Sequence, residues 1–116
     1  MTELASDMPQ LIAAAASDKK AFDIQILDMK KVTLVTDYFI ICSGNTTTQV
    51  KAIADNIDEK LAEQGIKMLH KEGYNEARWI LLDFGTCVVH VFVDEERRFY
   101  NIERLWSEAK AQLYSE

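Results

Sequence analysis

The fold is decided by residues 38–61, which read YFIICSGNTTTQVKAIADNIDEKL. Residues 38–42 form a continuous apolar run, which is typical of a strand buried on both faces. A short turn follows, and Thr46 with Gln49 matches a capping box that starts a helix. Apolar residues then recur at helical spacing until Gly65, which suits a left-handed helix end. A buried strand that leads directly into an amphipathic helix predicts helices packed on a sheet.

Working outward from this stretch, the pattern predicts the order α-β-β-α-β-β-β-α. Ser6 or Asp7 would cap the first helix, with Pro9 in its first turn, where a missing N–H costs nothing. The chain shows no internal repeat and no linker, so we expect one α/β (α+β) domain over residues 1–116 with a mixed five-stranded sheet. The expected helices are 7–20, 46–64 and 95–113, and the expected strands are 22–28, 38–42, 66–72, 78–83 and 87–93.

The last helix should bury one side against the sheet. Its candidate buried residues are Phe99, Ile102, Leu105, Trp106 and Leu113.

Two strands around Gly85-Thr86 predict a hairpin with a two-residue turn. In this register one face is wholly apolar and should be core; it carries Ile80, Leu82, Phe84, Cys87, Val89 and Val91. The opposite face mixes aromatic with polar side chains and carries Trp79, Leu81, Asp83, Val88, His90 and Phe92. This second face is either a core side covered by a helix or a partly exposed docking patch, because tryptophan often anchors interfaces.

Composition and charge narrow the function classes. The net charge of −6 gives no electrostatic attraction to nucleic acid, so we expect no direct sequence-specific nucleic-acid binding. No run approaches the roughly 20 apolar residues of a membrane span. The first residues lack a basic segment and the first arginine is Arg78, so neither a secretory signal nor a transit peptide is expected. With Cys42 and Cys87 inside apolar runs, a reducing, cytoplasmic location is expected.

The residues offer little chemistry. Two histidines and two cysteines without metal-ligand spacing predict no metal site and no cofactor. The turn at residues 43–45 precedes a helix and could hold a phosphate, but no paired carboxylates follow it for Mg²⁺. Asp28, Asp37 and Asp83 end separate elements. We therefore expect no catalytic residues and no enzyme activity, with a nucleotide-binding enzyme as a weaker alternative.

The chain resembles the Iojap family of ribosomal silencing factors, through motifs in the same order and spacing. These motifs are TDYFIICSGN (36–45), QVKAIAD (49–55), EGY (72–74), RWILLDFG (78–85), VVHVF (88–92) and RFYNIERLW (98–106). The resemblance covers about residues 7–107, and the residues after Leu105 look like a short C-terminal helical extension.

Several expectations follow from this resemblance alone. It implies a nucleotidyltransferase-like fold without the catalytic acids. It also implies binding to large-subunit ribosomal protein fourteen, which would block joining of the small subunit and repress translation when nutrients are limiting. A role in late large-subunit assembly is the alternative, and sequence does not separate the two. Homodimers occur in the family, and the aromatic patch could serve a dimer, the ribosome, or each in turn.

The resemblance also assigns partner-binding residues. Trp79 falls on the conspicuous interface tryptophan of the family. Phe84 conflicts with the face assignment above, which buries it, although a residue at the hairpin tip could still be reached by a partner. The full expected set is Trp79, Leu81, Asp83 and Phe84 on the hairpin, with Tyr74, Tyr100 and Asn101 nearby.

Overall fold

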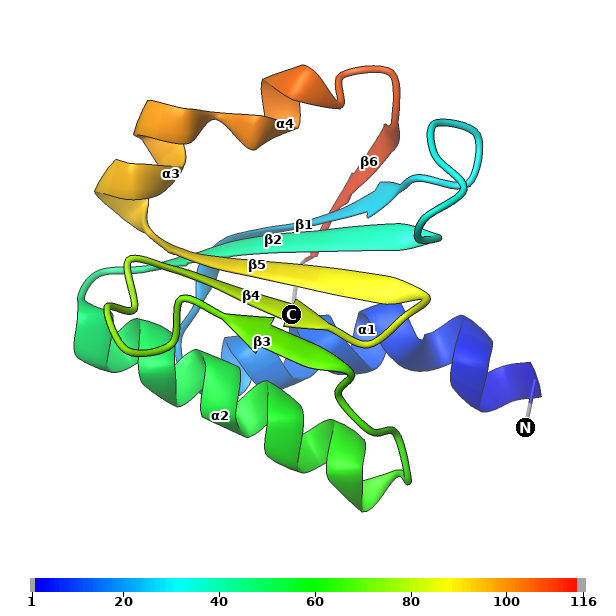
Figure 1. The fold of residues 1–116 in the computed structure, drawn as a ribbon, viewed down its shortest axis with the longest axis horizontal. Coiled ribbons are helices and arrows are strands. Elements are labelled where there is room, and N and C mark those ends of the chain that lie inside the picture. The colour runs from blue at the N-terminus through cyan, green and yellow to red at the C-terminus, as the bar shows by residue number, and fades with distance from the viewer. Residues whose placement is uncertain (1, 115–116) are drawn as a thin grey trace.

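One mixed sheet with helices on both of its faces makes up the fold (Figure 1). The computed structural model describes the backbone of residues 2–114 and the side chains of residues 7–114. Six strands lie in the order β3-β4-β5-β2-β1-β6, one more than expected. The strands are β1 (Phe22–Asp28), β2 (Tyr38–Gly44), β3 (His70–Glu72), β4 (Trp79–Asp83), β5 (Cys87–Val93) and β6 (Lys110–Leu113). The helices are α1 (Thr2–Asp18), α2 (Thr47–Glu63), α3 (Asp94–Tyr100) and α4 (Ile102–Leu105).

The parallel pair β2 and β5 forms the centre of the sheet, and every other neighbouring pair is antiparallel. Tyr38 lies opposite Cys87, and Gly44 lies opposite Val93. Both central strands are almost wholly buried, as their continuous apolar runs predict. The register brings the end of β2 beside the start of α3.

Helices α1 and α2 cover one face of the sheet and seal the larger core (Figure 1). The predicted cap of α2 is confirmed: the Gln49 N–H donates to Thr46 Oγ1 at 3.1 Å, while the Asn45 N–H donates to Gln49 Oε1 at 2.6 Å. Gly65 has φ 78°, as expected after the helix end. Asn56, a buried polar residue of α2, donates to the Ala15 carbonyl and ties the two helices together.

The hairpin between β4 and β5 has the expected two-residue turn, and the Phe84 N–H donates to the Cys87 carbonyl at 2.9 Å. The face predicted as core is confirmed, since all six of its side chains are buried beneath the helices. Phe84 is among them, with only 6% of its surface exposed.

The prediction of one long C-terminal helix is wrong. Asn101 adopts a left-handed conformation with φ 47°, which ends α3 and resets the direction of the chain. A turn at residues 106–109 then leads into β6, which pairs with β1 and covers backbone groups that would otherwise form an open edge. Only Ile102 and Trp106 of the expected buried stripe pack on the sheet; Phe99, Leu105 and Leu113 are at least 70% exposed.

Two boundaries also differ from expectation. Helix α1 begins at Thr2, so Pro9 lies inside it instead of in its first turn. Packing of Met8 and Ile12 against the sheet outweighs the one N–H that proline removes. The strand expected over 66–72 is regular only at His70–Glu72, an exposed edge strand.

The second face of the sheet is covered by α3, α4 and the turn that follows them (Figure 1). Arg97 of α3 is buried there and holds this cover to the sheet. Its guanidinium donates to the Asp23 carbonyl at 2.6 Å, to Ser43 Oγ at 2.8 Å and to Glu103 Oε2 at 2.9 Å. One side chain thus joins β1, β2, α3 and α4.

Candidate functional site

The aromatic face of β4 and β5 is only partly covered by the rest of the chain. We define it as the side that carries Trp79, Leu81, Asp83, Val88, His90 and Phe92. The β5 members are buried, whereas the three β4 members are half-buried. The cover formed by α3 and α4 therefore buries β5 and reaches β4 only in part, through the contact of Tyr100 with Trp79. The face is thus covered along β5 and partly exposed along β4, and a docking role for the exposed part stays a prediction.

Trp79 lies in a packed cluster at the start of β4. Its ring stacks on Phe92 with the centroids 4.8 Å apart, and Tyr100 of α3 lies 5.1 Å away. The indole N–H donates to His90 Nδ1 at 3.1 Å. Because the ring stacks on Phe92, lies beside Tyr100 and has its nitrogen hydrogen-bonded, the indole is held in one orientation.

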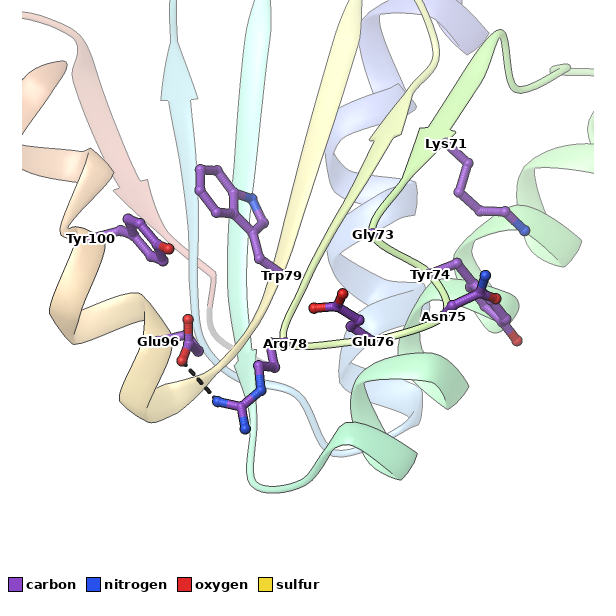
Figure 2. A pocket seen from close by; sticks show the side chains of 9 residues that line it. All are labelled: Lys71, Gly73, Tyr74, Asn75, Glu76, Arg78, Trp79, Glu96 and Tyr100. Carbon is purple, nitrogen blue, oxygen red and sulfur yellow. Dashed lines mark hydrogen bonds and ion pairs between the residues drawn. The ribbon is translucent and has the colours of Figure 1, made fainter.

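A hollow of about 570 Å³ opens beside this cluster (Figure 2). Tyr74 forms one side, and its hydroxyl donates to Asp55 Oδ2 of α2 at 3.0 Å. That hydrogen bond raises the pKa of Tyr74. Arg78 pairs with Glu96 of α3 at 3.1 Å on the other side. The hollow is lined by Lys71, Gly73, Tyr74, Asn75, Glu76, Arg78, Trp79, Glu96 and Tyr100.

Gly73 allows the loop below the hollow to approach Trp79 closely. Its φ is 78°, and a Cβ at this position would lie 2.2 Å from the Trp79 carbonyl oxygen. The Ala77 N–H returns to the Gly73 carbonyl at 2.9 Å and closes the loop. Only glycine fits here, so the loop and the Trp79 backbone are positioned together.

The structure brings three of the seven expected site residues together, since Tyr74, Trp79 and Tyr100 line the same hollow. Leu81 and Asp83 continue along β4 on the aromatic face, where Asp83 Oδ1 accepts the Gly85 N–H at 2.8 Å.

The other two lie apart from the hollow. Asn101 is exposed at the junction of α3 and α4. Phe84 is buried in the core on the opposite face of the sheet, which is the place that the hairpin register assigned to it.

Sequence reasoning missed Arg78, Glu96 and Phe99. The hairpin register could have indicated that Arg78 and Glu96 lie close together. It places Arg78 beside Val93, and Glu96 follows Val93 by about one turn of α3. Phe99 was expected to be buried, yet it is 79% exposed and packs edge-on against Tyr100 at 5.1 Å. It extends the aromatic cluster onto the outer side of α3.

The described residues provide neither a reactive cysteine nor a cluster of metal ligands. Burial raises the pKa of the Cys42 and Cys87 thiols to about 12, so neither is a thiolate at neutral pH. Within residues 7–114, no group of three or more His, Cys, Asp and Glu side chains is placed to hold a metal ion. Over the same part of the chain, no helix has both the length and the apolar composition to cross a membrane.

Comparison with known proteins decides the family. The sequence profile described as "Ribosomal silencing factor during starvation" matches residues 2–116. This chain belongs to the ribosomal silencing factor family. The family consists of ribosome-associated proteins that silence translation.

Relatives of this chain come from bacteria and from eukaryotic organelles. The ribosomal silencing factor of Bacillus subtilis is 51% identical over 100 residues, which cover 86% of this chain and 85% of the relative. The chloroplastic protein Iojap of Zea mays is 36% identical and is matched over 84% of this chain and 42% of its own length. A mouse relative, mitochondrial assembly of ribosomal large subunit protein 1, is 27% identical over 84% of this chain and 44% of its own length. The relatives named as silencing factors carry no enzyme name.

A solved structure supports the same fold. The crystal structure of a Chromobacterium violaceum protein superposes with a TM-score of 0.86 at 34% identity, and the match covers 96% of this chain and 92% of that one. The expected likeness to nucleotidyltransferases is not matched by these comparisons, and the sheet has six strands instead of five.

Proposed function

We propose that this silencing factor binds the large ribosomal subunit through large-subunit ribosomal protein fourteen, with the Trp79 end of the aromatic face as its docking surface. Bound there, it blocks joining of the small subunit and represses translation under nutrient limitation. The location is cytoplasmic, and the action needs neither a cofactor nor catalytic residues. Family membership supports the large-subunit target, and the held, half-exposed Trp79 supports the docking surface.

The geometry of the Trp79 cluster carries this proposal. An anchor contributes most when its rotamer is set before binding, because less conformational entropy is then lost on association. Trp79 meets this condition through Phe92, Tyr100 and His90. Tyr100 and Phe99 continue the aromatic surface outward, and Leu81 and Asp83 continue it along β4.

A steric mechanism is consistent with the size and charge of the molecule. The domain measures 35 × 33 × 27 Å, so one bound copy is thick enough to keep two large surfaces from closing. A standard interface takes about 800 Å² from each partner, roughly a ninth of the 6971 Å² accessible surface. The net charge of −6 favours encounter with a basic ribosomal protein.

The test is co-sedimentation of the purified chain with isolated large subunits, compared with Trp79→Ala. Loss of a central tryptophan anchor should weaken binding by about 2–4 kcal/mol, or about 30-fold or more. Leu34→Ala is the matched control, since Leu34 is fully exposed in the β1–β2 loop at the other end of the sheet. Unchanged binding of a folded Trp79→Ala variant would exclude Trp79 as the anchor.

A role in large-subunit assembly is the second candidate, favoured by the name of the mouse relative. Both roles use the same docking surface but differ in time of action. Sucrose-gradient profiles of depleted cells separate them: an assembly factor leaves immature large subunits, whereas a silencing factor leaves mature subunits that join too readily during starvation.

We also propose that the free chain forms a homodimer through the same aromatic surface. Dimer formation and ribosome binding would then exclude each other. Sedimentation velocity of the free chain, with and without Trp79→Ala, reports the dimer. A dimer that persists in this variant would place the dimer contact elsewhere on the molecule.

A further inference from the structure

His90 is an unusual residue for its position on β5. It is 5% exposed, and Phe39 lies edge-on against its ring at 4.7 Å, while Trp79 and Phe92 lie 5.9 and 6.3 Å away. Its strand neighbours Val89 and Val91 are aliphatic and fully buried. An aliphatic side chain would fill this place without any polar atom to satisfy.

The tautomer of His90 follows from its one hydrogen bond. An indole N–H can only donate, so Nδ1 of His90 must be the acceptor. The neutral ring therefore carries its proton on Nε2. Burial lowers the pKa of His90 to about 4, which keeps the ring neutral at physiological pH.

The other ring nitrogen of His90, Nε2, lowers the stability of the folded protein. Nε2 is buried and finds no hydrogen-bond partner among the described residues. A buried donor without an acceptor destabilises a folded protein. A residue that opposes stability in this way points to a role other than packing.

We propose that His90 is a positioning residue, which holds the Trp79 indole with its N–H turned into the protein and its six-membered ring presented to the ribosomal partner. In Figure 2 the indole nitrogen lies on the side of the ring away from Tyr100. Because the indole N–H is used within the chain, Trp79 has no hydrogen-bond donor left for the partner, which should offer an apolar pocket instead of a hydrogen-bond acceptor. This inference rests on the proposed function, because it assigns the orientation of its anchor.

The test combines His90→Leu, which removes the acceptor, with Trp79→Phe, which removes the donor. We expect His90→Leu to bind large subunits about three- to tenfold more weakly, the range of one hydrogen bond. Its melting temperature should change little, because the variant removes the unpaired Nε2–H but leaves the Trp79 N–H without its acceptor. In the Trp79→Phe background, His90→Leu should weaken binding no further, since the two residues act through the same hydrogen bond.

Two further variants keep the test independent of folding. His90→Gln retains an acceptor oxygen and should restore most of the binding. Val91→Ala is the matched structural control, because Val91 is fully buried on the same strand but on the opposite face of the sheet; it should lower stability without weakening the affinity of the folded protein.

Indole N–H resonances give a readout that packing alone would not move. Two tryptophans give two signals, assigned with Trp106→Phe, and the Trp79 signal should shift upfield and exchange faster with solvent in His90→Leu.

The outcomes separate the two proposals. If the wild-type chain does not bind large subunits, the proposed function and this inference both fail. If the wild-type chain binds and His90→Leu binds equally well, or if the losses from His90→Leu and Trp79→Phe are additive, the inference alone is overturned.

Discussion

The two faces of the sheet differ in composition and in cover. The face beneath α1 and α2 is wholly apolar along the β4–β5 hairpin, and all of its side chains are buried. The face beneath α3 and α4 holds fewer buried apolar residues, a buried arginine and a buried histidine with one unpaired nitrogen. The first face stabilises the domain, and the second gives up part of that stability to hold a half-exposed tryptophan. Substitutions on the two faces should therefore separate stability from binding.

The largest effect on stability is expected from Leu82→Ala. Leu82 is fully buried under the helices, and truncating such a leucine typically lowers the free energy of unfolding by about 3–4 kcal/mol. Urea unfolding followed by circular dichroism measures it. The folded fraction should keep its affinity for large subunits, and a specific loss of affinity would contradict the division between the faces.

Arg97→Met tests the cover of the second face. It leaves the Glu103 carboxylate without its partner and should lower the free energy of unfolding by about 3 kcal/mol. Hydrogen exchange should become faster over residues 94–105, and binding should weaken because Tyr100 loses its support. Adding Glu103→Gln removes the uncompensated charge and should recover part of the stability; no recovery would argue against the ion pair.

The third test varies pH. Burial lowers the pKa of His90 to about 4, whereas an unfolded histidine titrates near about 6.5. The unfolded chain thus takes up a proton first, so stability is full above pH 6.5 and falls as the pH drops toward 4. Between pH 7 and 5 the loss should be about 2 kcal/mol. The same pH series on His90→Leu should be flatter by this amount, and parallel curves would show that His90 titrates normally.

The smallest effect is expected at an exposed site outside both faces. Leu34 is fully exposed in the β1–β2 loop, so Leu34→Ser should change the free energy of unfolding by less than about 0.5 kcal/mol. Thermal melting checks this. A larger loss would mean that the loop packs against something in solution.

The sequence pattern correctly predicted those features that depend only on residues close together in the chain. Alternation along the hairpin assigned its core face correctly, including Phe84, because side chains of a strand alternate between the two faces. The capping box of α2 was predicted for a similar reason, since Thr46 and Gln49 act within one turn.

The C-terminal segment could not be predicted in this way. Its helical spacing over 95–113 is real, but the left-handed Asn101 and the pairing of Lys110 with Asp28 depend on the assembled sheet. The candidate site shows the same limit. The resemblance named Trp79 and Tyr100, whereas their contact and the inward hydrogen bond to His90 follow from tertiary packing. The roles of the seven residues in binding stay predictions.

The two edge strands of the sheet determine which kind of molecule could block binding of a partner protein. One border is β3, only three residues long, each with an ionisable side chain; the other is β6, which carries Lys110. Short, charged borders discourage the addition of a further strand. Extended peptides designed to hydrogen-bond along the backbone would therefore be poor competitors. Compact molecules that cap an aromatic ring and enter the adjoining depression are the better starting point.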